Sequence, residues 1–309
     1  MAPSWTTQPP RKSGMAYGIG SMEIYGSATD AVQRAAELAR IDLVSQLRVT
    51  VSGDFSSDIT ETSGTGRTTD VQRNVRSYAR SQVPEVQLDE VVIRETYTDT
   101  RYAYALAELD RQAAAARLRR AIDEQETELR RINALSPTGN TLQQLQPLLP
   151  ALTVFAAREK NVEQLALVST SRASLALPDD LRTLQQRIDR LVDQLKVAVE
   201  LMDRGAAEIS GNVIEALTSQ GLRVHDSEHA DLVFYVNATL SHREQDRSHY
   251  VFVDSRVTIR DQQGRALSSF SKQARGVSGI EDVARQTAAR NVGQMLSTEL
   301  AATLVDHLR

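Results

Sequence analysis

Residues 17–52, YGIGSMEIYGSATDAVQRAAELARIDLVSQLRVTVS, constrain the fold of this chain more than any other stretch. A short segment punctuated by Gly18 and Gly20 leads into an alanine-rich run whose apolar residues recur at helical spacing, which predicts a helix packed on one face. Apolar alternation over residues 47–51 then predicts a second strand. The stretch is therefore expected to be a strand–helix–strand unit, and it carries no evident catalytic chemistry.

The composition narrows the class of protein. The chain has 309 residues, 41% hydrophobic and 25% charged, which is ordinary globular composition and long enough for two domains and a connector. A net charge of −4 argues against a general nucleic-acid-binding protein, because no excess of cations is available to displace counterions from phosphates. The lack of cysteine excludes disulfides, thiolate metal sites and cysteine nucleophiles. No apolar run approaches the roughly 18–20 residues of a membrane-spanning helix.

The N-terminal part predicts a lead followed by a small domain. Residues 1–13 contain three prolines and are expected to be extended, with Trp5 docked on the domain that follows. Residues 14–110 are expected to form that domain, an α+β sandwich. Its last two strands, 86–97 and 101–109, are predicted to pair as a hairpin. A polar loop over residues 54–69 and a short helix over residues 70–82 are expected before the hairpin.

The middle of the chain, residues 111–194, is predicted to be a helical connector bundle, because apolar residues keep helical spacing between interleaved charges. Its helices are expected over residues 110–135, 141–157, 159–173 and 179–194.

Residues 195–309 predict a second α+β domain with the same order of elements as the first. Strands are expected at 197–202, 222–225, 231–241, 250–260 and 266–273, with helices at 206–219 and 280–308. The fold class is therefore α+β, with two small two-layer α/β sandwich domains (strand-helix-strand-strand-strand-helix) joined by the helical connector. Internal duplication and convergence on a common architecture both explain the repeated order.

Four groups of residues superficially suggest chemistry. Gly18, Gly20 and Gly26 miss the spacing of a dinucleotide-binding loop, so they are better interpreted as small residues that let the strand approach the helix. The pair His225 and His229 has metal-ligand spacing but falls in a strand end and loop, where that spacing does not bring both to one face.

The histidines His242 and His249 flank a predicted hairpin tip and are interpreted as solvated loop residues rather than metal ligands. Paired carboxylates at strand and helix starts are explained by capping and solvation. No catalytic constellation is recognised, so no enzyme activity, catalytic residue, cofactor or metal is predicted.

The pattern PSW…PP…YGIGS…A…AAELARIDL…L…V.VSG, followed by VVIRETYTDTRYAYALAELDR, resembles the LPP-twenty type bacterial lipoprotein family. It is also similar to the N-terminal part of flagellar assembly protein T. The resemblance covers about residues 3–120 and rests on Trp5, Gly18, Gly20, the AAELARIDL helix and the YALA strand. It implies a secreted protein, usually anchored to the outer membrane by a lipidated cysteine just before the domain. Since this sequence has no cysteine, either that anchor lies before it or the protein is plainly periplasmic.

The function expected from this resemblance is that of a non-enzymatic periplasmic or outer-membrane-associated scaffold of an envelope machine such as the flagellum. Its partners are expected to be envelope-assembly proteins or further copies of the chain, with no nucleic acid and with membrane contact only through a lipid anchor. A periplasmic binding protein for a glycan or small ligand is the alternative, and a hydrolase is a third. The predicted contact surface is the edge of the hairpin, through residues Val91, Ile93, Tyr97, Tyr102 and Tyr104.

Overall fold

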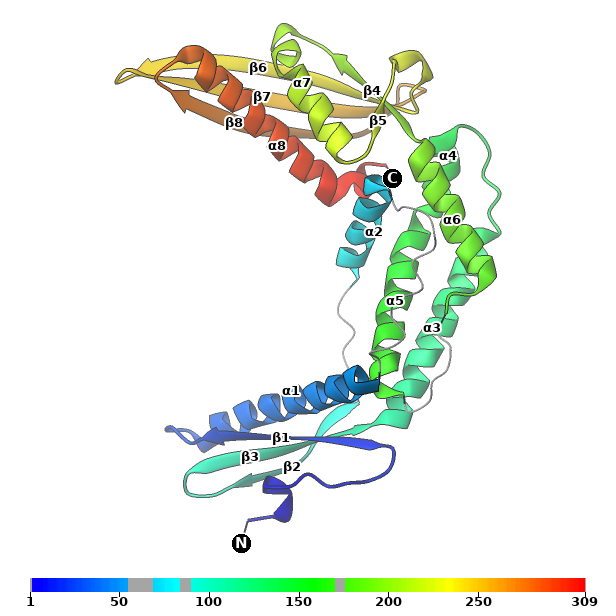
Figure 1. Cartoon of the computed structure of the whole chain (residues 1–309), viewed down its shortest axis with the longest axis vertical. Coiled ribbons are helices and arrows are strands. Elements are labelled where there is room, and N and C mark those ends of the chain that lie inside the picture. Colours follow the sequence, from blue (N-terminus) through cyan, green and yellow to red (C-terminus); the bar gives the residue numbers. More distant parts are fainter. Residues whose placement is uncertain (1, 55–68, 84–89, 170–175, 309) are drawn as a thin grey trace. The chain divides into compact units, whose positions relative to one another are not determined.

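A computed structural model describes residues 2–54, 69–83, 90–169 and 176–308 (Figure 1). The polar loop expected between residues 54 and 69 and the start of the strand expected at residue 86 lie largely outside the described residues. The chain divides into two compact units. The first unit comprises residues 1–66, 84–127 and 157–176, and the second comprises residues 67–83, 128–156 and 177–309. Each unit contains one β-sheet, so the α+β class with two sheet-containing domains is confirmed.

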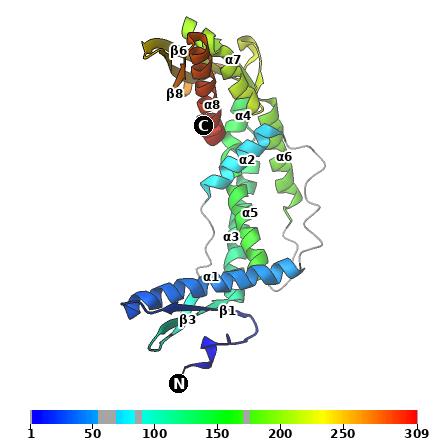
Figure 2. The ribbon, with the colours of Figure 1, turned by 60° about the vertical axis from the view of Figure 1, so that its left-hand side comes forward.

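The first unit contains a three-stranded antiparallel sheet covered on one face by a helix, α1 (Figure 2). The strand order is β1-β3-β2, and the β2–β3 hairpin is present as predicted. The elements are β1 (Met15–Glu23), α1 (Ala28–Asp54), β2 (Val91–Thr98) and β3 (Tyr102–Asp110).

The helix-facing side of this sheet is built from glycine and alanine. A Cβ atom on Gly20 would lie 2.0 Å from the carbonyl oxygen of Ala35, and one on Gly18 would lie 2.3 Å from that of Ala39. Only glycine fits at these two positions, since no real Cβ atom comes so close to backbone. The interpretation of Gly18 and Gly20 as residues that permit close approach to the helix is therefore confirmed. For Gly26 it is wrong, because a Cβ atom there would meet nothing within 4 Å, and its φ of 83° places it in the turn before α1.

The strand expected over residues 47–51 is wrong, because α1 continues through Asp54. Ser27 caps its start by accepting a hydrogen bond from the backbone N–H of Asp30 (3.3 Å). Leu43 and Leu47 are both buried and lie four residues apart, so the apolar residues near the end of the helix keep its spacing. Over a window as short as five residues, a helical stripe of this kind is not distinguishable from strand alternation.

Helices make up most of the described part of residues 111–194, and the short helix predicted at residues 70–82 is confirmed. The helices are α2 (Asp70–Gln82), α3 (Arg111–Asn133), α4 (Thr141–Leu145), α5 (Pro150–Val168) and α6 (Asp179–Gln194). The expected break near residue 158 is wrong, because α5 runs through it. The break comes earlier, after Leu145, where Pro147 enters a short 3-10 turn and Pro150 begins α5. Proline lacks the N–H that a helix interior needs but is favoured in the first turn.

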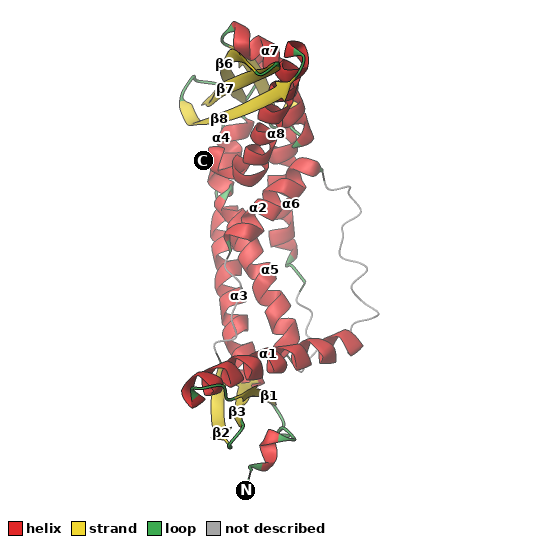
Figure 3. Ribbon diagram, turned by 90° about the vertical axis from the view of Figure 1, so that its left-hand side faces the viewer, coloured by secondary structure: helices red, strands yellow, loops and turns green. Residues whose placement is uncertain are grey.

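The second unit contains a mixed five-stranded sheet of order β5-β4-β6-β7-β8. Strand β4 is parallel to β5 and β6, and the remaining pairs are antiparallel. Helices α7 and α8 both pack on one face of this sheet (Figure 3). The elements are β4 (Lys196–Leu201), α7 (Arg204–Ser219), β5 (Arg223–Val224), β6 (Leu232–Gln245), β7 (Ser248–Asp261), β8 (Ala266–Ser278) and α8 (Glu281–His307). None of the described helices is both long enough and apolar enough to cross a membrane.

Within the described residues, the two units do not repeat the same order of elements. Along the described chain two strands of the first unit, β2 and β3, come after α1, whereas four strands of the second unit, β5 to β8, come after α7. The predicted order of strand-helix-strand-strand-strand-helix, with three strands after the first helix, therefore matches neither unit strand for strand in the described residues. The two units do share one packing feature, a strand glycine that lets a helix approach the sheet closely. Gly276 of β8 faces α8, and a Cβ atom there would lie 1.9 Å from the carbonyl oxygen of Ala284.

Candidate functional site

The face of the first sheet opposite α1 carries aromatic side chains. Along β3 the small residues 103, 105 and 107 are buried against α1, and Tyr102, Tyr104 and Leu106 point the other way. Tyr97 lies opposite Tyr104 on β2, with ring centroids 6.1 Å apart, and the rings of Tyr102 and Tyr104 are 6.2 Å apart. We call the three residues Tyr97, Tyr102 and Tyr104 the tyrosine face.

The five residues predicted to form a contact surface lie on both faces of the sheet. Val91 and Ile93 pack against the core beneath α1, and the three tyrosines form the opposite face. Strand β3 is central and pairs with both β1 and β2, so the edges of this sheet are β1 and β2. Tyr102 and Tyr104 therefore do not lie on an edge, and pairing with another strand is open to the β2 half of the hairpin.

A β-bulge in β2 explains why its residues change faces. The register with β3 shifts between Ile93 and Glu95. As a result the consecutive residues Arg94 and Glu95 both lie on the tyrosine side: Arg94 forms an ion pair with Glu108, and its guanidinium also lies 3.7 Å from the Glu95 carboxylate. Strict alternation along β2 would place Glu95 on the same face as Ile93. The bulge overturns this, because two residues oppose one at the irregularity.

The N-terminal lead covers part of the face of the first sheet that lies opposite α1. Trp5 is only 6% exposed and packs with Tyr17 and Leu106, as its predicted docking required. Its indole N–H donates a hydrogen bond to Glu95 (2.7 Å). Tyr97 and Tyr104 of the tyrosine face pack against this cluster, and all three tyrosines of the face are only partly buried.

Charged groups at the β2–β3 turn set the electrostatics of the tyrosine face. Backbone N–H groups of Tyr102 and Arg101 each donate to the Asp99 carboxylate at 2.7 Å, and these bonds lower the pKa of Asp99. Partial removal from water raises the pKa of the Tyr104 hydroxyl, and the charge of Asp99 raises it further. The Arg101 guanidinium lies 5.8 Å from the ring centre of Tyr102. Phenol rings with a nearby guanidinium are the groups enriched in protein–protein contacts.

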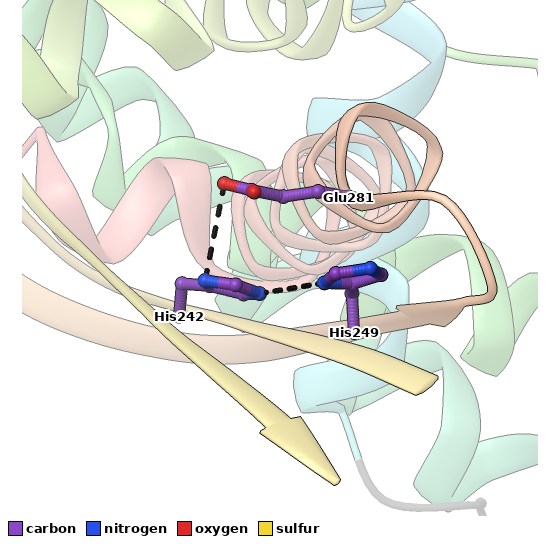
Figure 4. A group of neighbouring side chains, drawn as sticks. All are labelled: His242, His249 and Glu281. Carbon is purple, nitrogen blue, oxygen red and sulfur yellow. Dashed lines mark hydrogen bonds and ion pairs between the residues drawn. The ribbon is translucent and has the colours of Figure 1, made fainter. Parts of the chain in front are cut away.

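A second group of functional side chains lies in the other unit. The Nε2 atom of His242 on β6 lies 2.9 Å from Nδ1 of His249 on β7, and the two rings stack with centroids 5.1 Å apart (Figure 4). Glu281, at the start of α8, places a carboxylate oxygen 3.9 Å from Nδ1 of His242. The interpretation of these histidines as loop residues is wrong, because both lie in paired strands.

The sequence contained a signal for this group. Only Asp246 and Arg247 separate the paired residues Gln245 and Ser248, so both strands run almost to the tip of the hairpin. The turn lacks the usual Asn-Gly or Asp-Gly pair, and for that reason the segment resembled a loop. In contrast, His229 contacts Asp226 (2.9 Å) outside this group, as expected for a solvated loop histidine.

Each unit also has an open surface groove of about 560 Å³. The groove of the first unit runs along the lead segment 9–13 and the start of β1, and it includes Arg111. The groove of the second unit lies between the edge strand β8 and α8. Lys272, Arg275, Asn291 and Glu299 are among the residues that line it. Polar and charged side chains of this kind suit a hydrated ligand better than an apolar one.

Comparison with protein-family models gives no match for this sequence, and comparison with curated proteins gives none either. Among solved structures, the secreted protein HP1454 from Helicobacter pylori matches 94% of this chain and 98% of its own, with a TM-score of 0.52 and 14% identity. A minor lipoprotein from Acinetobacter baumannii matches 35% of this chain and 92% of its own, with a TM-score of 0.31 and 14% identity. Lipoprotein GNA1162 from Neisseria meningitidis matches 36% of this chain and 97% of its own, with a TM-score of 0.26 and 15% identity. The likeness to HP1454 shows a shared fold across nearly the whole chain, and these structural neighbours are bacterial lipoproteins and a secreted protein.

Proposed function

We propose that this chain is a non-enzymatic protein of the bacterial envelope that works outside the cytoplasm by holding partner proteins. The observation that carries the proposal is the fold shared with HP1454 over 94% of the chain, because that protein is described as secreted. The resemblance of residues 3–120 to the LPP-twenty family points to the same compartment. Anchoring to the outer membrane would further require a lipidated cysteine ahead of residue 1 in a precursor.

The proposed partner surface is the tyrosine face. Partly exposed tyrosines offer large, rigid contact areas with a polar tip, and little side-chain entropy is lost when they are ordered. Arg101 adds a positive group beside Tyr102. The finer assignment, a scaffold of an envelope machine such as the flagellum, rests on the resemblance to flagellar assembly protein T.

Two measurements in the bacterium that encodes the protein test this function. Cell fractionation should place the native protein in the periplasmic or outer-membrane fraction, and a purely cytoplasmic protein would contradict the proposal. A photo-crosslinking amino acid at Tyr102 should give a discrete protein adduct. The matched control is Tyr235, a partly exposed tyrosine of the second sheet with an arginine, Arg260, 5.3 Å from its ring centre. Equal adducts at both positions would remove the tyrosine face from the proposal.

Self-association through β2 is a separate form of the same idea. Val92 is 53% exposed on this edge strand, which can accept another strand. Light scattering of the full chain over a concentration series should show a mass that increases with concentration and returns to the monomer value in Val92→Lys. A strictly monomeric wild-type chain would leave a different protein as the proposed partner.

The groove beside β8 favours the second candidate function, capture of a glycan or small polar ligand. Lys272 and Glu299 form an ion pair across it (2.6 Å), so a ligand there would meet both charges. Thermal-shift measurements with cell-wall fragments test this candidate. Stabilisation that disappears in Asn291→Ala would favour ligand capture, and no shift with any fragment would leave the scaffold proposal alone.

A further inference from the structure

Two strands and a helix bring three metal-ligating side chains to one point of the second unit. The ligand atoms of His242, His249 and Glu281 all lie within 4.8 Å of one another (Figure 4). We propose that these residues bind a divalent late first-row transition-metal cation, with zinc as the best fit. This site is independent of the tyrosine face and does not rest on the proposed function.

The backbone fixes the two histidines on one face of the sheet. His242 pairs with Val251 across the β6–β7 ladder, and His249 lies two residues from Val251, so the two histidines are diagonal neighbours. Val251 is buried beneath the helices, which shows that this face is the one α7 and α8 cover. Both imidazoles therefore point toward the first turn of α8, where Glu281 begins the helix.

The distance between the two histidine nitrogens is close to the one that zinc requires. Zinc binds imidazole nitrogen at about 2.0–2.1 Å, so two nitrogens on a tetrahedral ion lie about 3.4 Å apart. Nε2 of His242 and Nδ1 of His249 are 2.9 Å apart, and separating them by about half an ångström to fit this geometry needs only small side-chain rotations. The exposed hairpin tip allows this movement, because His242 is 34% exposed at its side chain. Glu281 offers the third ligand from the helix side, with one ligand atom of each of the three residues lying within 4.8 Å of the other two.

A second layer of contacts holds the glutamate. Arg285, one turn further along α8, donates to Glu281 (2.8 Å) and also to Glu208 of α7 (2.9 Å). Metal-binding carboxylates are commonly held by such hydrogen bonds, which orient the ligand oxygen. Glu208 offsets the charge of the arginine, so the guanidinium does not leave a net positive charge beside the cation.

The donor types select the class of metal. Two imidazoles and one carboxylate suit zinc, copper or nickel, whereas calcium and magnesium require mostly oxygen ligands. Three protein ligands leave a fourth zinc position for water or an added ligand. Without metal the same histidines would simply share a hydrogen bond, and this alternative is decided by direct binding measurements.

The test uses the full chain without a histidine tag and zinc chloride as the probe, by isothermal titration calorimetry. We expect one zinc ion per chain, and at least tenfold weaker binding in His242→Ala and in His249→Ala. The matched control is His229→Ala, which removes a histidine paired with a carboxylate elsewhere and should leave the affinity unchanged. Calcium chloride should give no binding heat.

A measurement on the unaltered protein guards against variants that fail to fold. Zinc should shift the imidazole NMR signals of two histidines and leave those of the other three in place. Absence of zinc binding by the wild-type chain would overturn the proposal. The proposal would also be overturned if the double variant His242→Ala, His249→Ala bound zinc with wild-type affinity. It would be overturned equally if His229→Ala weakened zinc binding as much as His242→Ala or His249→Ala.

Discussion

The indole N–H of Trp5 donates a hydrogen bond of 2.7 Å to the carboxylate of Glu95, which lies 90 residues further along the chain. The bond depends on the bulge in β2, because the bulge turns Glu95 to the side of the sheet that Trp5 covers. A single side chain thus joins the N-terminal lead to the edge of the first sheet.

Trp5→Phe should lower the free energy of unfolding by about 1 kcal/mol, because it removes the hydrogen bond and keeps most of the buried ring. Trp5→Ala should cost about 3–5 kcal/mol, since a large buried side chain is lost. Urea denaturation, monitored by circular dichroism, measures the free energy of unfolding of both variants. If the two variants were equally stable, the ring would contribute nothing and the lead would not be docked.

Gly20→Ala should destabilise the first unit by about 3 kcal/mol or more, because its methyl group would overlap the backbone carbonyl of Ala35. The matched control is Gly211→Ala within α7, where a Cβ atom meets nothing within 4 Å. There alanine should stabilise the protein by about 0.5–1 kcal/mol through its higher helix propensity. The two melting temperatures should therefore move in opposite directions, and a shared direction would contradict the packing of β1 on α1.

Asp203 links the start of α7 to β6 through a titratable group. Burial alone would raise the pKa of its carboxyl, but hydrogen bonds from the N–H groups of Ala206 (2.7 Å) and Ala238 (3.1 Å) outweigh this and lower the pKa below its ordinary value. A lowered pKa in the folded protein adds stability that is fully present above the unfolded value and is lost as the pH falls through the folded value.

Asp203→Ala should therefore cost about 1 kcal/mol near neutral pH, as for loss of a helix cap. The difference from the wild type should stay constant from neutral pH to about 5 and shrink as the pH falls below about 4. Chemical denaturation at several pH values measures it. A difference that grew on acidification would show that the charge of Asp203 does not stabilise the fold.

Arg247 adopts a left-handed backbone conformation, with φ of 62°, at the tip of the β6–β7 hairpin. Such a conformation costs a residue other than glycine about 1 kcal/mol, so Arg247→Gly should stabilise the protein by up to about that amount. Arg243→Gly, in the extended part of the same hairpin, should destabilise it instead. Thermal denaturation compares the two variants, and a loss of stability in Arg247→Gly would contradict the strained turn.

Much of the fold was predictable, because long alternating strands such as β6 and β7 and the amphipathic α6 carry strong periodic signals. The face of the sheet that the tyrosines occupy was harder to predict. Both parities of β3 are apolar, and only the small size of Ala103 and Ala105, opposite Met22 and Gly20 of β1, shows which side meets the helix. A bulge leaves no clear mark in a single sequence, so the faces of Ile93 and Glu95 were not distinguishable.

The histidine group could not be assembled from spacing alone. His242 and His249 are brought together by the register of a turn whose residues are unusual for a hairpin, and Glu281 joins them from a helix more than thirty residues away. The position of that helix depends on Gly276, whose backbone lies against Ala284. Periodicity predicts each of these elements separately but not the distance between them.

The close contact of β1 with α1 also determines how such a protein can change over generations. Alternate positions of the strand differ sharply in tolerance: Gly18 and Gly20 admit no other side chain, whereas Ser21, which pairs with Tyr104 of β3, is exposed on the side that α1 does not touch. Substitutions can therefore accumulate on one side of the sheet while the packing on the other stays constant. A lineage built on this unit can acquire new binding specificities by exchanging its outward residues, with no need to redesign the core.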